Sequence, residues 1–161
     1  MARQLPIEIF MPPNILKAKV GSAVGGIDMA AIKRAEAAML VLKAEFSDWL
    51  AVDVARLGEC RDRFAAAPSA ATREDLFRAA HDLKGQAETF EYPMIARIAA
   101  SLTKLIDGTQ PSGDVALGLV DAHVAAIRVV FRDTIKTPTD MVATVLVEEL
   151  EARVIEALAG A

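Results

Sequence analysis

Residues 73–90 of this chain, REDLFRAAHDLKGQAETF, decide its fold. Apolar residues repeat there at steps of 4, 3, 4 and 3, at Leu76, Ala80, Leu83, Ala87 and Phe90. On a helix this spacing places the five side chains in one narrow stripe, as in the helices of antiparallel bundles. The stretch therefore predicts a helix over residues 73–90 that begins after an N-cap at Thr72 and packs against other helices along this stripe.

Comparable stripes predict four further helices. We expect them over residues 29–66, from Pro93 to the DGTQPSGD turn, over residues 115–136 and over residues 140–158, with Asp28 and Asp114 as N-caps. Their apolar positions are, in chain order, Met39, Leu42, Phe46, Leu50, Leu57 and Phe64; Ile95, Ile98, Leu102 and Leu105; Leu117, Val120, Val124, Ile127 and Phe131; and Val142, Leu146, Leu150 and Val154. Asp53 interrupts the first of these stripes.

The composition favours the same architecture. Hydrophobic residues make up 53% of the 161 residues but aromatic residues only 5%, which is typical of closely packed aliphatic helices. We predict an all-α protein: an antiparallel up-down four-helix bundle with an irregular N-terminal arm and an extra C-terminal helix. The expected boundaries are residues 1–28 for the arm, 29–136 for the bundle, and 137–161 for a linker and the last helix.

The arm holds three of the seven prolines, so we expect irregular chain there with at most a short helix near residues 14–20. The alternation in LPIEIF, residues 5–10, suits a short strand, but the sequence offers no partner strand. These residues are therefore expected to form coil.

Charge and cysteine content exclude several classes of function. The formal net charge is −4, and the basic residues are scattered, which disfavours a nucleic-acid partner. Cys60 is the only cysteine, so no intramolecular disulfide can form, and no metal-ligand spacing occurs in the sequence. Prolines interrupt the N-terminal stretch, and no run of about 18 apolar residues predicts a membrane span. A cytoplasmic protein without a metal site is expected.

The helix over residues 73–90 also carries polar residues on its outer face. At about 100° per residue, His81 points away from the apolar stripe, together with Arg78, Lys84, Gly85 and Glu88. Phe77 lies one turn back, at the edge of this face, where it suits either a docking surface or the border of the core. The sequence therefore places a histidine, two cations and a glycine together on one exposed surface.

Gly85 is unexpected in this position. A glycine inside a helix costs about 1 kcal/mol relative to alanine, because it adds backbone freedom that folding must remove. Bare backbone one turn from His81 would let another macromolecule bring a reactive group up to the ring. Lys84 would supply positive charge for an anion bound there, with phosphate as the obvious candidate.

These residues resemble the histidine-containing phosphotransfer (HPt) domain, whose motif is H-x-L-K-G followed by small residues and a second helix. His81, Leu83, Lys84 and Gly85 match the motif, and the resemblance covers roughly residues 35–135. Members often have a glycine where this chain has Glu91, which leaves the turn after the helix open.

The resemblance implies a phosphorelay intermediate. His81 would accept a phosphoryl group from the aspartate of one response-regulator receiver domain and pass it to another, while Lys84 steadies the phosphoryl oxygens. The Mg²⁺ would come with the receiver, so the protein would be a phosphoryl carrier, without a cofactor of its own and not an autonomous enzyme. A hybrid histidine kinase is a further expected partner, and the protein is expected to be a monomer.

Other residues receive smaller roles. We expect Phe77, Arg78 and Glu88 to help dock the partner, and Thr103 or Lys104 of the next helix to hold the inner ring nitrogen or the phosphate. His123, which has no glycine or flanking cations nearby, is expected to border the core.

Two alternative functions stay open. The chain could be a helical adaptor that binds receiver domains without accepting phosphate. It could also be the phosphoacceptor part of a sensor kinase, although it has no Gly-rich ATP lid, and HDLKG differs from the acidic residue and polar pair expected after a kinase histidine.

Overall fold

A computed structural model describes residues 28–109, 115–137 and 140–160, with the side chains of residues 43 and 44 left out. Five helices span these residues: α2 (Met29–Ala66), α3 (Ala70–Thr89), α4 (Pro93–Gly108), α5 (Leu117–Arg132) and α6 (Met141–Ala159). The expected coil at residues 5–10, the short helix near residues 14–20 and the proposed cap Asp114 lie outside the described residues. Residues 40–161 form one compact unit, which holds the packed part of the bundle.

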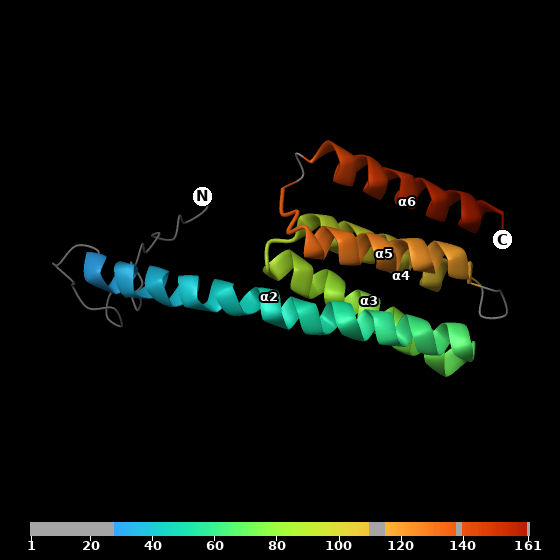
Figure 1. The fold of residues 1–161 in the computed structure, drawn as a ribbon, viewed down its shortest axis with the longest axis horizontal. Coiled ribbons are helices and arrows are strands. Elements are labelled where there is room, and N and C mark those ends of the chain that lie inside the picture. The colour runs from blue at the N-terminus through green and yellow to red at the C-terminus, as the bar shows by residue number, and fades with distance from the viewer. Residues whose placement is uncertain (1–27, 110–114, 138–139, 161) are drawn as a thin grey trace, which may run out of the picture. The chain divides into compact units, whose positions relative to one another are not determined.

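Consecutive helices of the bundle run antiparallel, and α6 lies along α4 and α5 (Figure 1). Helix α4 is central, because it packs against α3, α5 and α6. Helix α2 is tied to α3 by Arg56–Asp82 and Arg63–Asp75, and to α5 by Arg61, whose Nε donates to Asp121 Oδ1 at 2.6 Å. Every described element is helical, which confirms the predicted four-helix bundle with an added C-terminal helix.

The predicted stripe of α3 is confirmed, since Leu76, Ala80, Leu83, Ala87 and Phe90 are all buried in one hydrophobic core. The stripe of α4 is also buried throughout. These two helices pack against each other, so their periodic residues face a neighbouring helix rather than solvent.

Two other stripes were predicted wrongly in part. Met39 and Leu42 of α2 are exposed, and burial begins at Leu50. In α6, Val142 is 80% exposed, whereas the neighbouring Ala143 is buried. The buried positions of α6 are Ala143, Val147, Leu150 and Val154. Apart from Thr144, the first two turns of α6 are apolar on all sides, so the sequence does not specify which side packs on α4 and α5.

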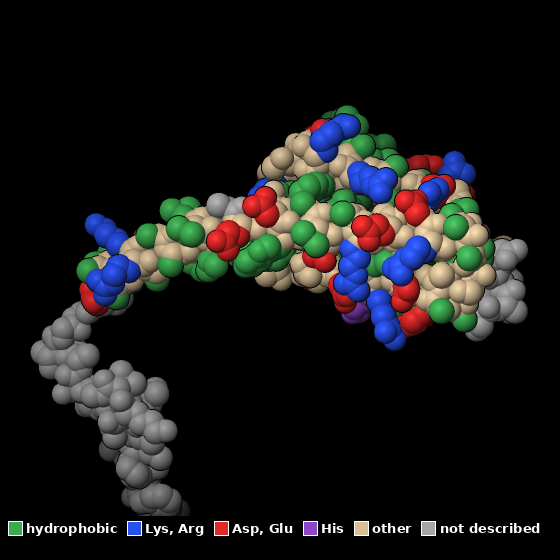
Figure 2. Space-filling view, turned by 60° about the horizontal axis from the view of Figure 1, so that its bottom comes forward, with side chains coloured by type: hydrophobic (Ala, Val, Ile, Leu, Met, Phe, Trp, Pro, Cys, Tyr) green, Lys and Arg blue, Asp and Glu red, His purple; other side chains and the backbone are tan. Residues whose placement is uncertain are grey.

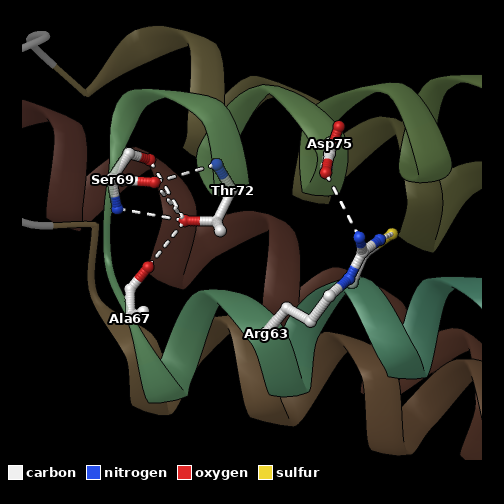
Figure 3. A network of polar contacts seen from close by, with 6 residues as sticks. Arg63, Ala67, Ser69, Thr72 and Asp75 are labelled. Atoms are coloured by element: carbon white, nitrogen blue, oxygen red, sulfur yellow. Dashed lines mark hydrogen bonds and ion pairs between the residues drawn. The ribbon is translucent and has the colours of Figure 1, made fainter.

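The start of α3 corrects the predicted cap. The helix begins at Ala70, and Ser69 is the N-cap: its side chain accepts a hydrogen bond from Thr72 N, while Thr72 Oγ1 accepts one from Ser69 N. Figure 3 shows this capping box, in which Thr72 also donates to Ala67 O. Thr72 therefore supplies the second half of the cap. Asp28 is confirmed as the cap of α2, because its Oδ1 accepts from the backbone of the first turn.

The turn that ends α3 resolves the question at Glu91. Glu91 has a φ of 64°, in the left-handed region that favours glycine. Tyr92 N donates to Ala87 O and Glu91 N to Glu88 O, the hydrogen bonds of a Schellman motif. Glu91 thus takes the backbone conformation that a glycine would take at this place. The turn then leads into Pro93, the first residue of α4, as predicted.

Candidate functional site

Helix α3 holds His81 at the surface, as the sequence predicts. Leu83, which is buried, lies two positions from His81 and anchors the helix in the core, while the imidazole is exposed. The ring of Phe77 stacks beside it, with centroids 6.0 Å apart and planes inclined by 23°. Phe77 itself is half-buried and packs on the core. One face of the histidine ring is therefore held next to a fixed aromatic side chain.

The surface next to His81 is open at Gly85. A Cβ atom added to Gly85 would meet nothing within 4 Å. The packing of the bundle therefore does not require a glycine here, which leaves the helix cost of Gly85 without a structural reason among the described residues. The open space is available to a partner that approaches His81 along α3.

The predicted charges of this face differ in how firmly they are held. Arg78 Nε donates to Glu74 Oε1 at 2.7 Å, one turn back on the same helix. Glu88 is exposed, and Lys84 is half-buried. Within the described part of the chain, the ammonium group of Lys84 has no ion-pair partner. An incoming anion would therefore not have to displace any described carboxylate from Lys84.

Helix α2 adds charges to this face, and the periodicity of α3 did not predict them. Arg56 Nη1 donates to Asp82 Oδ2 at 3.3 Å, so a guanidinium group from α2 lies over the residue directly after His81. Asp53 is close to both groups: partial burial raises its pKa above the usual value, Arg56 counteracts the increase, and Asp82 adds to it. Figure 2 shows basic and acidic side chains interleaved along the face over α2 and α3. In the sequence, the only sign of this group of charges, Asp53, Arg56 and Asp82, was the interruption of the apolar stripe of α2 at Asp53.

Thr103 and Lys104 lie in other environments. The hydroxyl of Thr103 donates to Ala100 O at 2.8 Å, one turn back in α4. Lys104 lines a hollow of about 300 Å³ between α4 and α6, together with Arg97 and Glu151, which form an ion pair. Neither the hydrogen bond of Thr103 nor this hollow involves His81. That Thr103 or Lys104 holds the ring of His81 or the phosphate therefore stays a prediction.

His123 corrects the expectation that it borders the core. It is 0% exposed, and both ring nitrogens have partners: Nδ1 lies 2.7 Å from Leu119 O and Nε2 lies 3.0 Å from Ser101 Oγ. Because a carbonyl can only accept, Nδ1 carries the proton and Nε2 accepts from the Ser101 hydroxyl. Burial lowers the pKa of His123 below the ordinary histidine value. The spacing of His123 from the apolar residues of α5 did not indicate that Ser101 of α4 would be its hydrogen-bond partner.

A second hollow lies beside the candidate site. It has a volume of about 290 Å³ and is formed by the first turns of α3 and the end of α4, with Phe77, Glu74 and Asp107 among its lining residues.

The described residues contain no cluster of side chains that could hold a metal ion. No helix among the described residues is long and apolar enough to cross a membrane.

The fold and site define a class of protein: a helical bundle that presents one exposed histidine, followed at the third and fourth positions by lysine and glycine, on the outer face of a core helix. The chain belongs to the Hpt domain family, because the model of the Hpt domain matches residues 44–137. This segment contains most of α2 and all of α3, α4 and α5, and it ends before α6. Comparison with curated proteins and with solved structures found no match.

Membership of the family carries a general function. Hpt domains take part in phosphotransfer in two-component signalling, where they interact with response-regulator receiver domains. They are phosphocarriers rather than catalysts.

Proposed function

We propose that this protein is a phosphorelay intermediate, in which His81 accepts a phosphoryl group from the aspartate of one receiver domain and passes it to another. The observation that carries the proposal is the exposed imidazole of His81, fixed on α3 inside the segment that matches the family, with Lys84 and Gly85 at the motif positions. A receiver of this kind would be a separate response regulator or part of a hybrid histidine kinase.

The chemistry requires a free lone pair on an exposed ring nitrogen. In neutral imidazole one nitrogen carries the proton and the other has a lone pair, which attacks the phosphorus of the aspartyl phosphate in line. The N–P bond forms as the bond between phosphorus and the carboxylate oxygen breaks, and the electron pair of that bond leaves with the aspartate. Transfer to a second receiver is the same exchange in reverse.

The residues of this chain would bind and orient rather than catalyse. Helix α3 holds the ring through its buried stripe, Phe77 stacks on the ring, and Lys84 balances negative charge on the phosphoryl oxygens. Phe77, Arg78 and Glu88 would contact the receiver around His81. We propose that the Mg²⁺ needed to neutralise the transferring group belongs to the receiver domain, so the isolated protein would have almost no activity.

The test is direct transfer of label. A purified receiver domain carrying ³²P-labelled aspartyl phosphate is mixed with the full-length protein in the presence of Mg²⁺. We expect label that is acid-labile and alkali-stable, as phosphohistidine is, and we expect none in His81→Gln. His123→Gln is the matched control, since it removes the buried histidine and should keep the label.

Two results would contradict the proposal. If wild-type protein takes no label from any of the receivers of its cell, His81 is not a relay intermediate. If His81→Gln supports signalling while still binding receivers, the protein is a helical adaptor that does not use phosphate.

A further inference from the structure

Three cations lie on or beside the outer face of α3 that carries His81. They differ in how readily each could leave its present partner and bind a new anion. Lys84 has no ion-pair partner within the described part of the chain. Arg78 is held by Glu74 through its Nε at 2.7 Å, within one helix. Arg56 comes from α2 and contacts Asp82 through Nη1 alone, at 3.3 Å. Its Nε and Nη2 therefore do not contribute to that contact.

The contact between Arg56 and Asp82 is weak enough to be exchanged. Their side chains are 51% and 46% exposed, and exposed ion pairs contribute only about 0–1 kcal/mol. A phosphoryl group on a side chain brings a charge of about −1.5 to −2 and three strong acceptor oxygens. Charge-assisted bonds from a guanidinium group to phosphate are among the strongest in proteins. Asp82, once released, would remain solvated.

The position of Arg56 allows this exchange. Asp82 directly follows His81 in α3, so Arg56 contacts the helical turn that carries the imidazole, at a residue about 100° round the helix from it. Asp53 of α2 interacts with Asp82, so a phosphoryl group on His81 would add negative charge close to existing carboxylates. Lys84 supplies one cation from α3, and Arg56 supplies one from α2 through its contact with Asp82.

We propose that Arg56 is a second phosphoryl-binding residue, which leaves Asp82 when His81 is phosphorylated and, together with Lys84, holds the phosphoryl oxygens between α2 and α3. This inference rests on the proposed function, because it concerns the phosphorylated form of His81. It assigns to α2 a role in stabilising phosphohistidine, in addition to its role in the core.

The chain provides a matched control. Arg63 pairs with Asp75 at 3.5 Å, and this pair also joins α2 to α3, with side chains 59% and 49% exposed (Figure 3). Asp75 lies six positions before His81, so Arg63 contacts α3 farther from the histidine than Arg56 does. Arg63 also donates to Cys60 Sγ at 3.1 Å within α2, so Arg63→Gln should lower stability at least as much as Arg56→Gln. Only Arg56→Gln should affect phosphohistidine.

The experiment measures the equilibrium of phosphoryl transfer between a ³²P-labelled receiver and the full-length protein at low ionic strength. We expect Arg56→Gln to shift the equilibrium away from His81 by about 3- to 10-fold, and Arg63→Gln to leave it unchanged within about 2-fold. Arg56→Lys should recover part of the effect, since it restores the charge without the planar fork of donors. The difference should shrink at 1 M salt, where the screening length is about 3 Å.

The outcomes separate the two proposals. If the wild type takes label on His81 and Arg56→Gln matches it, or if both variants shift the equilibrium equally, the role of Arg56 is wrong while the relay function stands. If the wild type takes no label on His81, both proposals fall. A selective effect of Arg56→Gln with recovery in Arg56→Lys would support the role of Arg56, because a purely structural role would not distinguish the two arginines.

Discussion

The two histidines of this protein occupy opposite environments. His81 lies on the outer face of α3, exposed and beside the ring of Phe77, whereas His123 lies on the inner face of α5 and is completely buried. Both nitrogens of His123 are used in hydrogen bonds to Leu119 and Ser101, so its lone pair is already occupied. The comparison teaches that the two histidines differ in access and in partners: the ring of His81 is open to another molecule, whereas both ring nitrogens of His123 are occupied inside the protein.

The largest expected effect is on stability, when each histidine is replaced by alanine. His123→Ala should lower the free energy of unfolding by about 2–4 kcal/mol, because it opens a cavity and leaves the Ser101 hydroxyl without its acceptor. His81→Ala should change it by no more than about 0.5 kcal/mol, since the side chain is exposed. Urea unfolding of both variants checks this difference. Equal losses would mean that His81 also supports the fold.

The pH dependence of unfolding should report on the buried His123. Burial lowers the pKa of His123, so the unfolded chain binds a proton more readily than the folded one. The contribution of His123 to stability is therefore complete above the ordinary pKa of about 6.5 and decreases as the pH falls below it, by at most about 1.4 kcal/mol per pH unit. Unfolding measured between pH 5 and 8 should show a smaller acid-side loss in His123→Gln than in wild type. The same loss in both proteins would contradict the assignment.

The smallest effect concerns the backbone beside His81. Gly85→Ala should raise the free energy of unfolding by about 0.5–1 kcal/mol, because the new methyl group meets open space and alanine favours helix. The same change should slow phosphoryl transfer by about tenfold, since the methyl group displaces the incoming receiver. Calorimetry and the labelling assay measure the two effects.

The control for this substitution is Gly118→Ala in α5, where an added Cβ also meets nothing within 4 Å. It should not slow transfer. If Gly85→Ala transfers phosphate as fast as wild type, the glycine does not serve the approach of the partner.

Much of the fold was predictable because helix periodicity is a local property. The stripe from Leu76 to Phe90 and the outward direction of His81 both follow from steps of three and four residues, and the structure confirms both. The errors arose where local rules allow two answers. Thr72 and Ser69 both suit an N-cap, and the capping box uses both, with Ser69 as the N-cap. The first turns of α6 are apolar apart from Thr144, so the side that is buried depended on the helices packed against it.

By itself, therefore, the sequence determined the five helices, the core-facing stripe of α3 and the outward group of His81, Lys84 and Gly85, because residues three and four apart are neighbours on any helix. Only the tertiary structure decided what reaches these helices from elsewhere. It brought Arg56 to Asp82 across 26 positions and Ser101 to His123 across 22 positions. Such contacts depend on which faces of two helices meet, and the periodicity of a single helix does not contain that information.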